Sequence, residues 1–188
     1  MRKDFNKQSW LFPMPVFIIG TYDENGVPDA MNAAWGGMYD YNQVTVSLGS
    51  HVSTDNIRKS KAFTISFATR QMVEASDYVG LVSLKQDKDK LNKAKLTVKK
   101  SEKVNAPLFL EYPVTIECEL ASIDGKMGEG ATVIGNIVNV SVDESVLTDG
   151  KIDFNKFEPI AFDPANNKYR VVKEEVADAF KVGLKLKN

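Results

Sequence analysis

Hydroxyl and amide groups are concentrated in residues 47–57, where an apolar stretch gives way to Ser-Leu-Gly-Ser-His-Val-Ser-Thr-Asp-Asn-Ile. Residues 44–48 alternate between apolar and polar side chains, as a half-buried strand does, and residues 54–59 resemble the first turns of a helix. The first N–H groups of a helix lack intrahelical partners, and the helix dipole favours negative charge beside them. This stretch therefore has the chemistry of an anion site, such as a phosphate site.

The same hydroxyls also have a structural interpretation. Ser53 or Thr54 would make an ordinary helix N-cap, and capping is the commoner use of such residues. His51 is the only histidine of the chain. Hydrogen bonding of His51 to nearby loop backbone is a simpler expectation than proton transfer, because the sequence offers no obvious residue to orient it as a base.

Composition argues against several other kinds of chemistry. A chain of 188 residues with 43% hydrophobic content suits one sizeable core, and we expect a single domain over residues 1–188. The net charge of -1 gives no electrostatic footprint for nucleic acid or an anionic membrane. With Cys118 as its only cysteine and with one histidine, the chain cannot form an intrachain disulfide or a multi-cysteine metal site, and a Ser-His-Asp triad is not expected.

No segment resembles a targeting or membrane-spanning sequence. The N-terminal residues lack an apolar signal core, and no run approaches the roughly 20 apolar residues of a membrane span. We therefore expect a cytoplasmic protein that binds neither nucleic acid nor membrane.

Short strands are expected to position the hydroxyl-rich stretch. Residues 16–22 are rich in β-branched and aromatic side chains, and the Asn-Gly turn at residues 23–26 predicts a hairpin whose return strand covers residues 28–35. Further strands are predicted over residues 62–67, 114–120 and 131–140, helical segments over residues 72–83 and 169–180, and a solvated helix or loop over residues 85–95. This pattern favours an antiparallel barrel with peripheral helices over a doubly wound sheet.

The order of these landmarks resembles the flavin reductase-like family, the FMN-binding split barrels that include flavoredoxins and flavin-dependent ferric reductases. The resemblance covers most of the chain and is carried by residues 15–21, 23–26, 32–35, 47–56, 78–83, 89–91, 106–107, 117–119 and 169–172. Two positions depart from the family pattern. Val79 stands where many members have a cysteine, and Leu91 stands where an aromatic residue is common, so no thiol chemistry is expected at Val79.

The resemblance implies a mainly β fold, a Greek-key-like split β-barrel with peripheral α-helices, that binds FMN at a strand edge. The flavin ring would lie against residues 32–35, where small alanine side chains let backbone N–H groups approach it, and the phosphate would lie near Ser53, Thr54 and Asn56 with Lys90 as a balancing charge. Trp35 could cover the ring edge or could equally be a buried core tryptophan. The implied cofactor-binding residues are Asn32, Ala33, Ala34, Trp35, Ser47, Leu48, Gly49, His51, Ser53, Thr54, Asn56 and Lys90.

The activity implied by the resemblance is that of an oxidoreductase. Bound FMN would take hydride from NADH or NADPH and pass electrons to free flavin, ferric complexes or a protein acceptor. Because the cofactor performs the redox step, no catalytic side chain and no metal are expected. An FMN electron carrier without its own NAD(P)H site, or a non-catalytic flavin-binding module, remains an alternative. The resemblance also implies a homodimer whose FMN sites lie near the subunit boundary and are completed by residues of the second chain.

Overall fold

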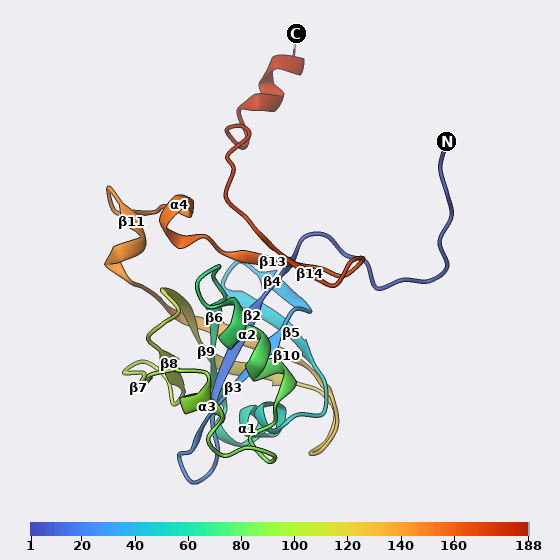
Figure 1. Cartoon of the computed structure of the whole chain (residues 1–188). Helices are drawn as coiled ribbons and strands as arrows, with labels where there is room; N and C mark the ends of the chain where they lie inside the picture. The colour runs from blue at the N-terminus through green and yellow to red at the C-terminus, as the bar shows by residue number, and fades with distance from the viewer. Residues whose placement is uncertain (188) are drawn as a thin grey trace.

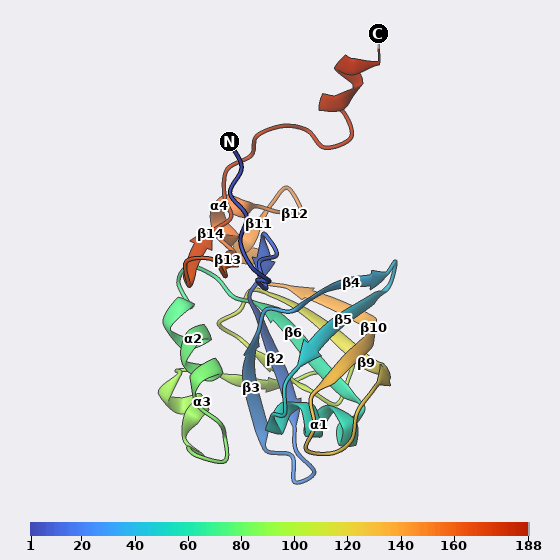
Figure 2. The ribbon, with the colours of Figure 1, turned by 90° about the vertical axis from the view of Figure 1, so that its right-hand side faces the viewer.

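One curled antiparallel sheet forms the body of the protein in the computed structural model, which describes residues 1–187 (Figures 1 and 2). Its seven strands lie in the order β3-β2-β6-β9-β10-β5-β4, and every pairing is antiparallel. The strands are β2 (Phe17–Tyr22), β3 (Pro28–Ala33), β4 (Gly36–Asp40), β5 (Gln43–Leu48), β6 (Ala62–Phe67), β9 (Val114–Ile123) and β10 (Ala131–Val142). This half-barrel confirms the mainly β, split-barrel fold expected from the sequence.

The two edge strands of the sheet are neighbours in sequence. Only residues 34–35 separate the end of β3 from the start of β4, so the sheet curls until its first and last strands meet at one corner. Three helices flank this arrangement: α1 (Val52–Ser60), α2 (Val73–Leu81) and the short α3 (Lys90–Lys93). In Figure 2, α1 lies at the lower end of the half-barrel, and α2 and α3 lie beside β3.

Smaller elements surround the sheet. Strands β1 (Met14–Pro15), β13 (Ile160–Asp163) and β14 (Lys168–Val171) form a second sheet, and β7 (Val98–Lys100) pairs with β8 (Pro107–Phe109). The segment after β10 holds η1 (Glu144–Val146), the β11 (Leu147–Thr148) and β12 (Lys151–Ile152) pair, and α4 (Phe154–Phe157). Residues 1–12 form an N-terminal arm and residues 174–187, including η2 (Val182–Leu186), form a C-terminal arm, and both lead away from the body (Figures 1 and 2).

Two hydrophobic clusters lie on opposite faces of the sheet. Inside the half-barrel, Ile19, Val46 and Cys118 belong to one cluster, as the alternation of their strands predicts. On the outer face, Ile18 of β2 packs in a second cluster with Val79 of α2. Strand β2 is therefore buried on both faces, which explains its nearly continuous apolar sequence.

Sequence patterns located most elements correctly but not all their ends. Helix α1 begins at Val52, two residues earlier than expected, and the return strand of the first hairpin ends at Ala33 instead of Trp35. The predicted helix over residues 169–180 is wrong. Tyr169 lies in β14, where its ring packs against Phe162 of β13, and strand pairing determines the backbone there.

The charge-rich segment over residues 85–95 is mixed in character. Leu91 is buried as expected, and Lys90 is also buried, so the segment is only partly solvated. Across residues 1–187, none of the helices has both the length and the apolar character needed to cross a bilayer.

Candidate functional site

The edge of β3, the end of β5 and the start of α1 come together at the open corner of the half-barrel. The Ser47 N–H donates a 2.7 Å hydrogen bond to the Trp35 carbonyl oxygen, which joins two of the expected site segments. Ala34, Trp35 and Ser47 also line one cavity of about 600 Å³ together with residues 8–11 of the N-terminal arm. The structure thus brings the two segments expected to contact a flavin into one place.

Helix α1 begins without a side-chain cap. His51 is its N-cap residue, with extended backbone, and accepts only the 3.3 Å hydrogen bond from the Asp55 N–H. The expectation that Ser53 or Thr54 caps the helix is therefore wrong, because both lie inside its first turn. The leading N–H groups of α1 have no side-chain acceptor and are available to an anion.

The two hydroxyls of the first turn point to internal acceptors. The Thr54 hydroxyl donates to the Gly49 carbonyl oxygen at 2.8 Å, and the Ser53 hydroxyl donates to Asp29 Oδ2 at 2.8 Å. Both residues are buried. Their contact with a phosphate through side chains remains a prediction from the sequence, but in this structure the free donors of the turn are backbone N–H groups.

Asn56 and Lys90, two further expected phosphate residues, are also engaged inside the protein. The Asn56 side chain donates to Thr21 Oγ1 at 3.1 Å, and Lys90 Nζ forms a 3.1 Å ion pair with Asp29 Oδ1. The side chains of Lys90 and Asp29 are 2% and 3% exposed. Asp29 therefore joins the second strand of the hairpin to both flanking helices, α1 and α3.

Asn32 connects β3 to α2. Its side-chain amide donates to the Ser76 carbonyl oxygen at 2.8 Å. Helix α2 can lie this close because Gly80 has no side chain: a Cβ atom at Gly80 would sit 2.8 Å from Asn32 Cβ. Asn32 is thus held in a fixed orientation at the β3 edge.

Tyr169 lies beside the same part of α2. Its hydroxyl donates to Asp77 Oδ1 at 2.7 Å. Burial first, and then the Asp77 carboxylate, raise the pKa of Tyr169 to about 12, although a hydrogen bond from Asn32 opposes that shift. Tyr169 is therefore a protonated donor at neutral pH, fixed next to Asn32.

Trp35 is largely exposed at 55%, so its alternative interpretation as a buried core residue is wrong. The chain leaves β3 before this residue and crosses to β4, which places the indole outside the core. His51 is also exposed, and its ring packs against Gly49, where a Cβ would lie 2.9 Å from Nε2. Both side chains are accessible to a ligand.

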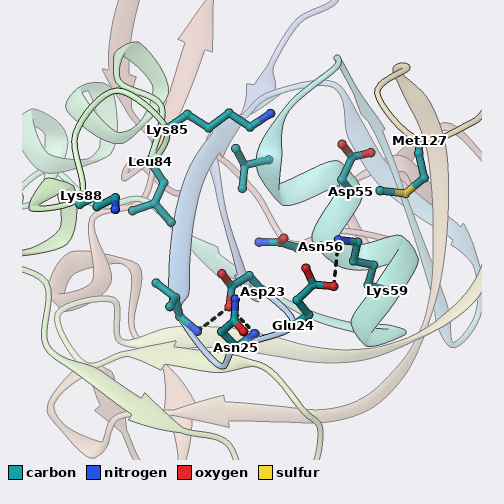
Figure 3. Close-up of a pocket in the computed structure, with 12 residues that line it drawn as sticks. Asp23, Glu24, Asn25, Asp55, Asn56, Lys59, Leu84, Lys85, Lys88 and Met127 are labelled. Carbon is teal, nitrogen blue, oxygen red and sulfur yellow. Dashed lines mark hydrogen bonds and ion pairs between the residues drawn. The ribbon is translucent and has the colours of Figure 1, made fainter.

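A second cavity, of about 550 Å³, runs along the side of α1 (Figure 3). Val52 lies at the end where the helix begins, and Lys85 and Lys88 line the wall formed by the loop before α3. Lys59 pairs with Glu24 at 3.2 Å, and Figure 3 shows this pair at the opposite end of the cavity from Lys85. Lys85 and Lys88 are both exposed, and neither is used in an ion pair among the residues that the structure describes.

Sequence reasoning missed Asp29, Lys85 and Tyr169. Asp29 could have been noticed, because it is a lone acid in a strand of small and apolar residues. Lys85 was treated as part of a solvated charge run, and the position of Tyr169 depends on β14, which the helical spacing of the C-terminal residues concealed.

A curled antiparallel half-barrel with few helices is the fold of the split-barrel flavin-binding proteins to which this structure is similar. A family model described as a flavin reductase like domain matches residues 9–163, and the chain belongs to this family. This confirms the family inferred from the order of the sequence landmarks.

Solved structures agree with this assignment. Flavoredoxin of Desulfovibrio vulgaris (Miyazaki F) is 36% identical, with a TM-score of 0.90, over 97% of this chain and 100% of that chain. Flavoredoxin from Methanosarcina acetivorans is 25% identical, with a TM-score of 0.88, over 99% of each chain. Nitrilotriacetate monooxygenase component B from Bacillus cereus, at 19% identity and a TM-score of 0.78 over 95% of this chain and 98% of that chain, supports the fold alone.

Proposed function

We propose that this protein binds FMN in the cytoplasm and is an oxidoreductase that takes hydride from NADH or NADPH and passes electrons to a small-molecule or protein acceptor. Free flavin and ferric complexes are the expected small acceptors. The observation that carries the proposal is the uncapped start of α1 beside a cavity whose lining includes three lysines and three acidic residues, with Lys85 and Lys88 free of ion pairs in residues 1–187, in a chain of the flavin reductase-like family.

The residues at the site fit FMN at both of its ends. The first N–H groups of α1 offer donors to the phosphate, and Lys85 and Lys88 offer positive charge close to the same turn. At the ring end, β3 pairs only with β2, so peptide groups on its outer edge are outside the sheet ladder. The small side chains of Ala33 and Ala34 leave that backbone accessible.

FMN, when bound, supplies the hydride and electron transfer. The protein would orient the flavin ring at the β3 edge, where Asn32 is fixed by Ser76 and Trp35 lies exposed. Tyr169 keeps its proton at neutral pH, since its pKa is raised to about 12. This arrangement offers hydrogen bonds and an accessible ring face and requires no side-chain nucleophile.

Absorbance spectroscopy tests the proposal directly. The purified protein should be yellow or should bind FMN with a stoichiometry of about one, and anaerobic NADH or NADPH should bleach the flavin band. A colourless protein without saturable FMN binding would contradict the central claim.

An FMN electron carrier is the second candidate, and the full-length similarity to a flavoredoxin favours it. Such a carrier would be bleached by dithionite or by a reduced protein partner but not by nicotinamides. A protein that binds FMN and is reduced by none of these donors would instead be a binding module.

We also propose that the protein is a homodimer held by its two arms. Leu11, Val176 and Phe180 are 71%, 88% and 100% exposed in the single chain, although all three are apolar. Burying such side chains in a second copy removes apolar area from water. Light scattering should give twice the 20.9 kDa mass of the chain, and a mass of one chain at micromolar concentration would contradict the proposal.

A further inference from the structure

Three buried polar side chains form a continuous chain between the elements that frame the expected cofactor site. Lys90 of α3 pairs with Asp29 Oδ1 at 3.1 Å, and Ser53 of α1 donates to Asp29 Oδ2 at 2.8 Å. All three residues are almost fully buried. Asp29, on β3, is the only member that contacts both of the others.

The arrangement determines what Lys90 can contribute to an anion. A buried ammonium group is tolerated only with a compensating charge, and here a carboxylate supplies it at 3.1 Å. The pair is neutral as a unit, so it provides little net attraction to a phosphate outside it. The Ser53 hydroxyl is likewise already used as a donor to Asp29.

The network instead fixes position. Asp29 lies three residues before Asn32 on the same short strand, and Ser53 lies in the first turn of α1. The strand carries the expected ring contacts, and the helix start carries the free N–H groups. The hydrogen bond from Ser53 to Asp29 joins this strand to the helix and therefore sets the distance between the ring end and the phosphate end of the site.

We propose that Asp29 is a positioning residue of the FMN site, which holds Ser53 and Lys90 so that the first turn of α1 faces the phosphate. This inference rests on the proposed function. In this proposal, Lys85 and Lys88 supply the positive charge that attracts the phosphate. Asp29, Lys90 and Ser53 instead align the backbone N–H groups that bind it.

The discriminating quantity is the ratio of the dissociation constants for riboflavin and FMN, which isolates the phosphate contribution. Asp29→Ala should lower this ratio at least about tenfold while riboflavin affinity changes less than about twofold, because only the phosphate donors move. The double variant Asp29→Asn with Lys90→Met removes both buried charges yet retains an acceptor for Ser53. It should restore the ratio to within about threefold of the wild-type value.

Lys93→Met is the matched control. Lys93 belongs to the same short helix, but its ion pair with Asp87 is at the surface, with the lysine side chain 55% exposed. Removing this positive charge should leave the ratio unchanged. If the double variant binds FMN as weakly as Asp29→Ala does, Lys90 acts through its charge and the proposal is wrong.

Hydrogen–deuterium exchange of the ligand-free protein gives a readout that does not require FMN. Asp29→Ala should accelerate exchange in residues 55–60, whose amides are hydrogen-bonded within α1, and leave β2 and β6 protected, whereas the double variant should exchange at the wild-type rate. Faster exchange throughout the sheet, or equal weakening of riboflavin and FMN, would mean that Asp29 only supports the fold. If the wild-type protein binds no FMN while exchange follows the expected pattern, the proposed function fails and the alignment of α1 by Asp29 stands.

Discussion

Lys85 and Lys90 belong to the same charge-rich segment but occupy opposite environments. Lys90 is buried against Asp29, whereas Lys85 is exposed at the wall of the cavity beside α1. An exposed lysine without an ion pair can place its charge on a ligand, while a neutralised one cannot. The two residues should therefore respond differently to substitution.

Replacing Lys85 and Lys88 together by methionine should weaken FMN binding by about tenfold or more, since a hydrogen bond to a charged group is worth about 1.5–3 kcal/mol. Riboflavin binding should change by less than about twofold, because riboflavin has no phosphate. Quenching of flavin fluorescence during titration measures both affinities. Equal losses for the two ligands would place the phosphate elsewhere.

At the scale of elements, the close approach of α2 to β3 depends on one glycine. Gly80 lies where a Cβ would come within 2.8 Å of Asn32 Cβ. The same contact region holds the hydrogen bond between Asn32 and the Ser76 carbonyl. The position of Asn32 and the packing of the helix are thus coupled.

Gly80→Ala should lower the free energy of unfolding by about 1–3 kcal/mol, the usual cost of overpacking, despite the better helix propensity of alanine. Urea titration followed by circular dichroism measures this change. Gly37→Ala in β4 is the control, because a Cβ there has no neighbour within 4 Å. A Gly80→Ala protein as stable as the Gly37→Ala protein would show that α2 moves without cost.

Elements with strong periodicity could be predicted from the sequence. Strands such as β2 and β6 have alternating or continuously apolar side chains because the sheet buries them, and this pattern is visible in the sequence. The C-terminal residues Val172, Val176 and Phe180 have helical spacing, yet none of them lies in a helix, since pairing of β14 with β13 sets the direction of the chain. Long-range pairing leaves no local signal in sequence.

For the candidate site, the sequence predicted which segments lie together but not the hydrogen bonds of their side chains. The order of motifs predicted that residues 32–35 and 47–56 share one site, and the structure brings the two segments together through the hydrogen bond from the Ser47 N–H to the Trp35 carbonyl oxygen. The internal use of the Ser53 and Thr54 hydroxyls could not be predicted, because their acceptors come from β3 and from the preceding loop. Residue type alone does not show which way a hydroxyl points.

For the whole molecule, stability at high pH depends on acids whose pKa values are raised by the fold, among them the buried Cys118 and Tyr112 and the half-buried Tyr169. Burial raises the pKa of the Cys118 thiol from 9.0 to about 12, and the pKa values of Tyr112 and Tyr169 from 10.0 to about 12. Each group is protonated more readily in the folded than in the unfolded state. Their contribution is complete below the unfolded pKa and is lost as pH rises toward the folded pKa.

These groups should therefore have little effect on the free energy of unfolding between pH 7 and 8. They should lower it as the pH rises from about 9 to 12. In Cys118→Ala the fall should begin nearer pH 10, because only the tyrosines then remain. Chemical denaturation at each pH measures both profiles. Parallel profiles for the two proteins would show that Cys118 titrates normally in the folded state.

The assembly has a separate prediction. Val176→Ser together with Phe180→Ser should convert the proposed dimer to a monomer. These side chains are 88% and 100% exposed in the single chain, so a partner chain would have to bury their apolar surface. Light scattering measures the mass, and circular dichroism checks that each chain stays folded. A dimer that persists in this variant would place the interface away from the C-terminal arm.

The burial of Cys118 also bears on chemical durability. Reduced flavins react with dioxygen and release peroxide, and thiolates are the protein groups that peroxide attacks most readily. The single thiol of this chain is fully enclosed by the sheet, and its raised pKa keeps it protonated. A protein that handles reduced flavin in air would thus carry no cysteine that its own by-product could easily oxidise.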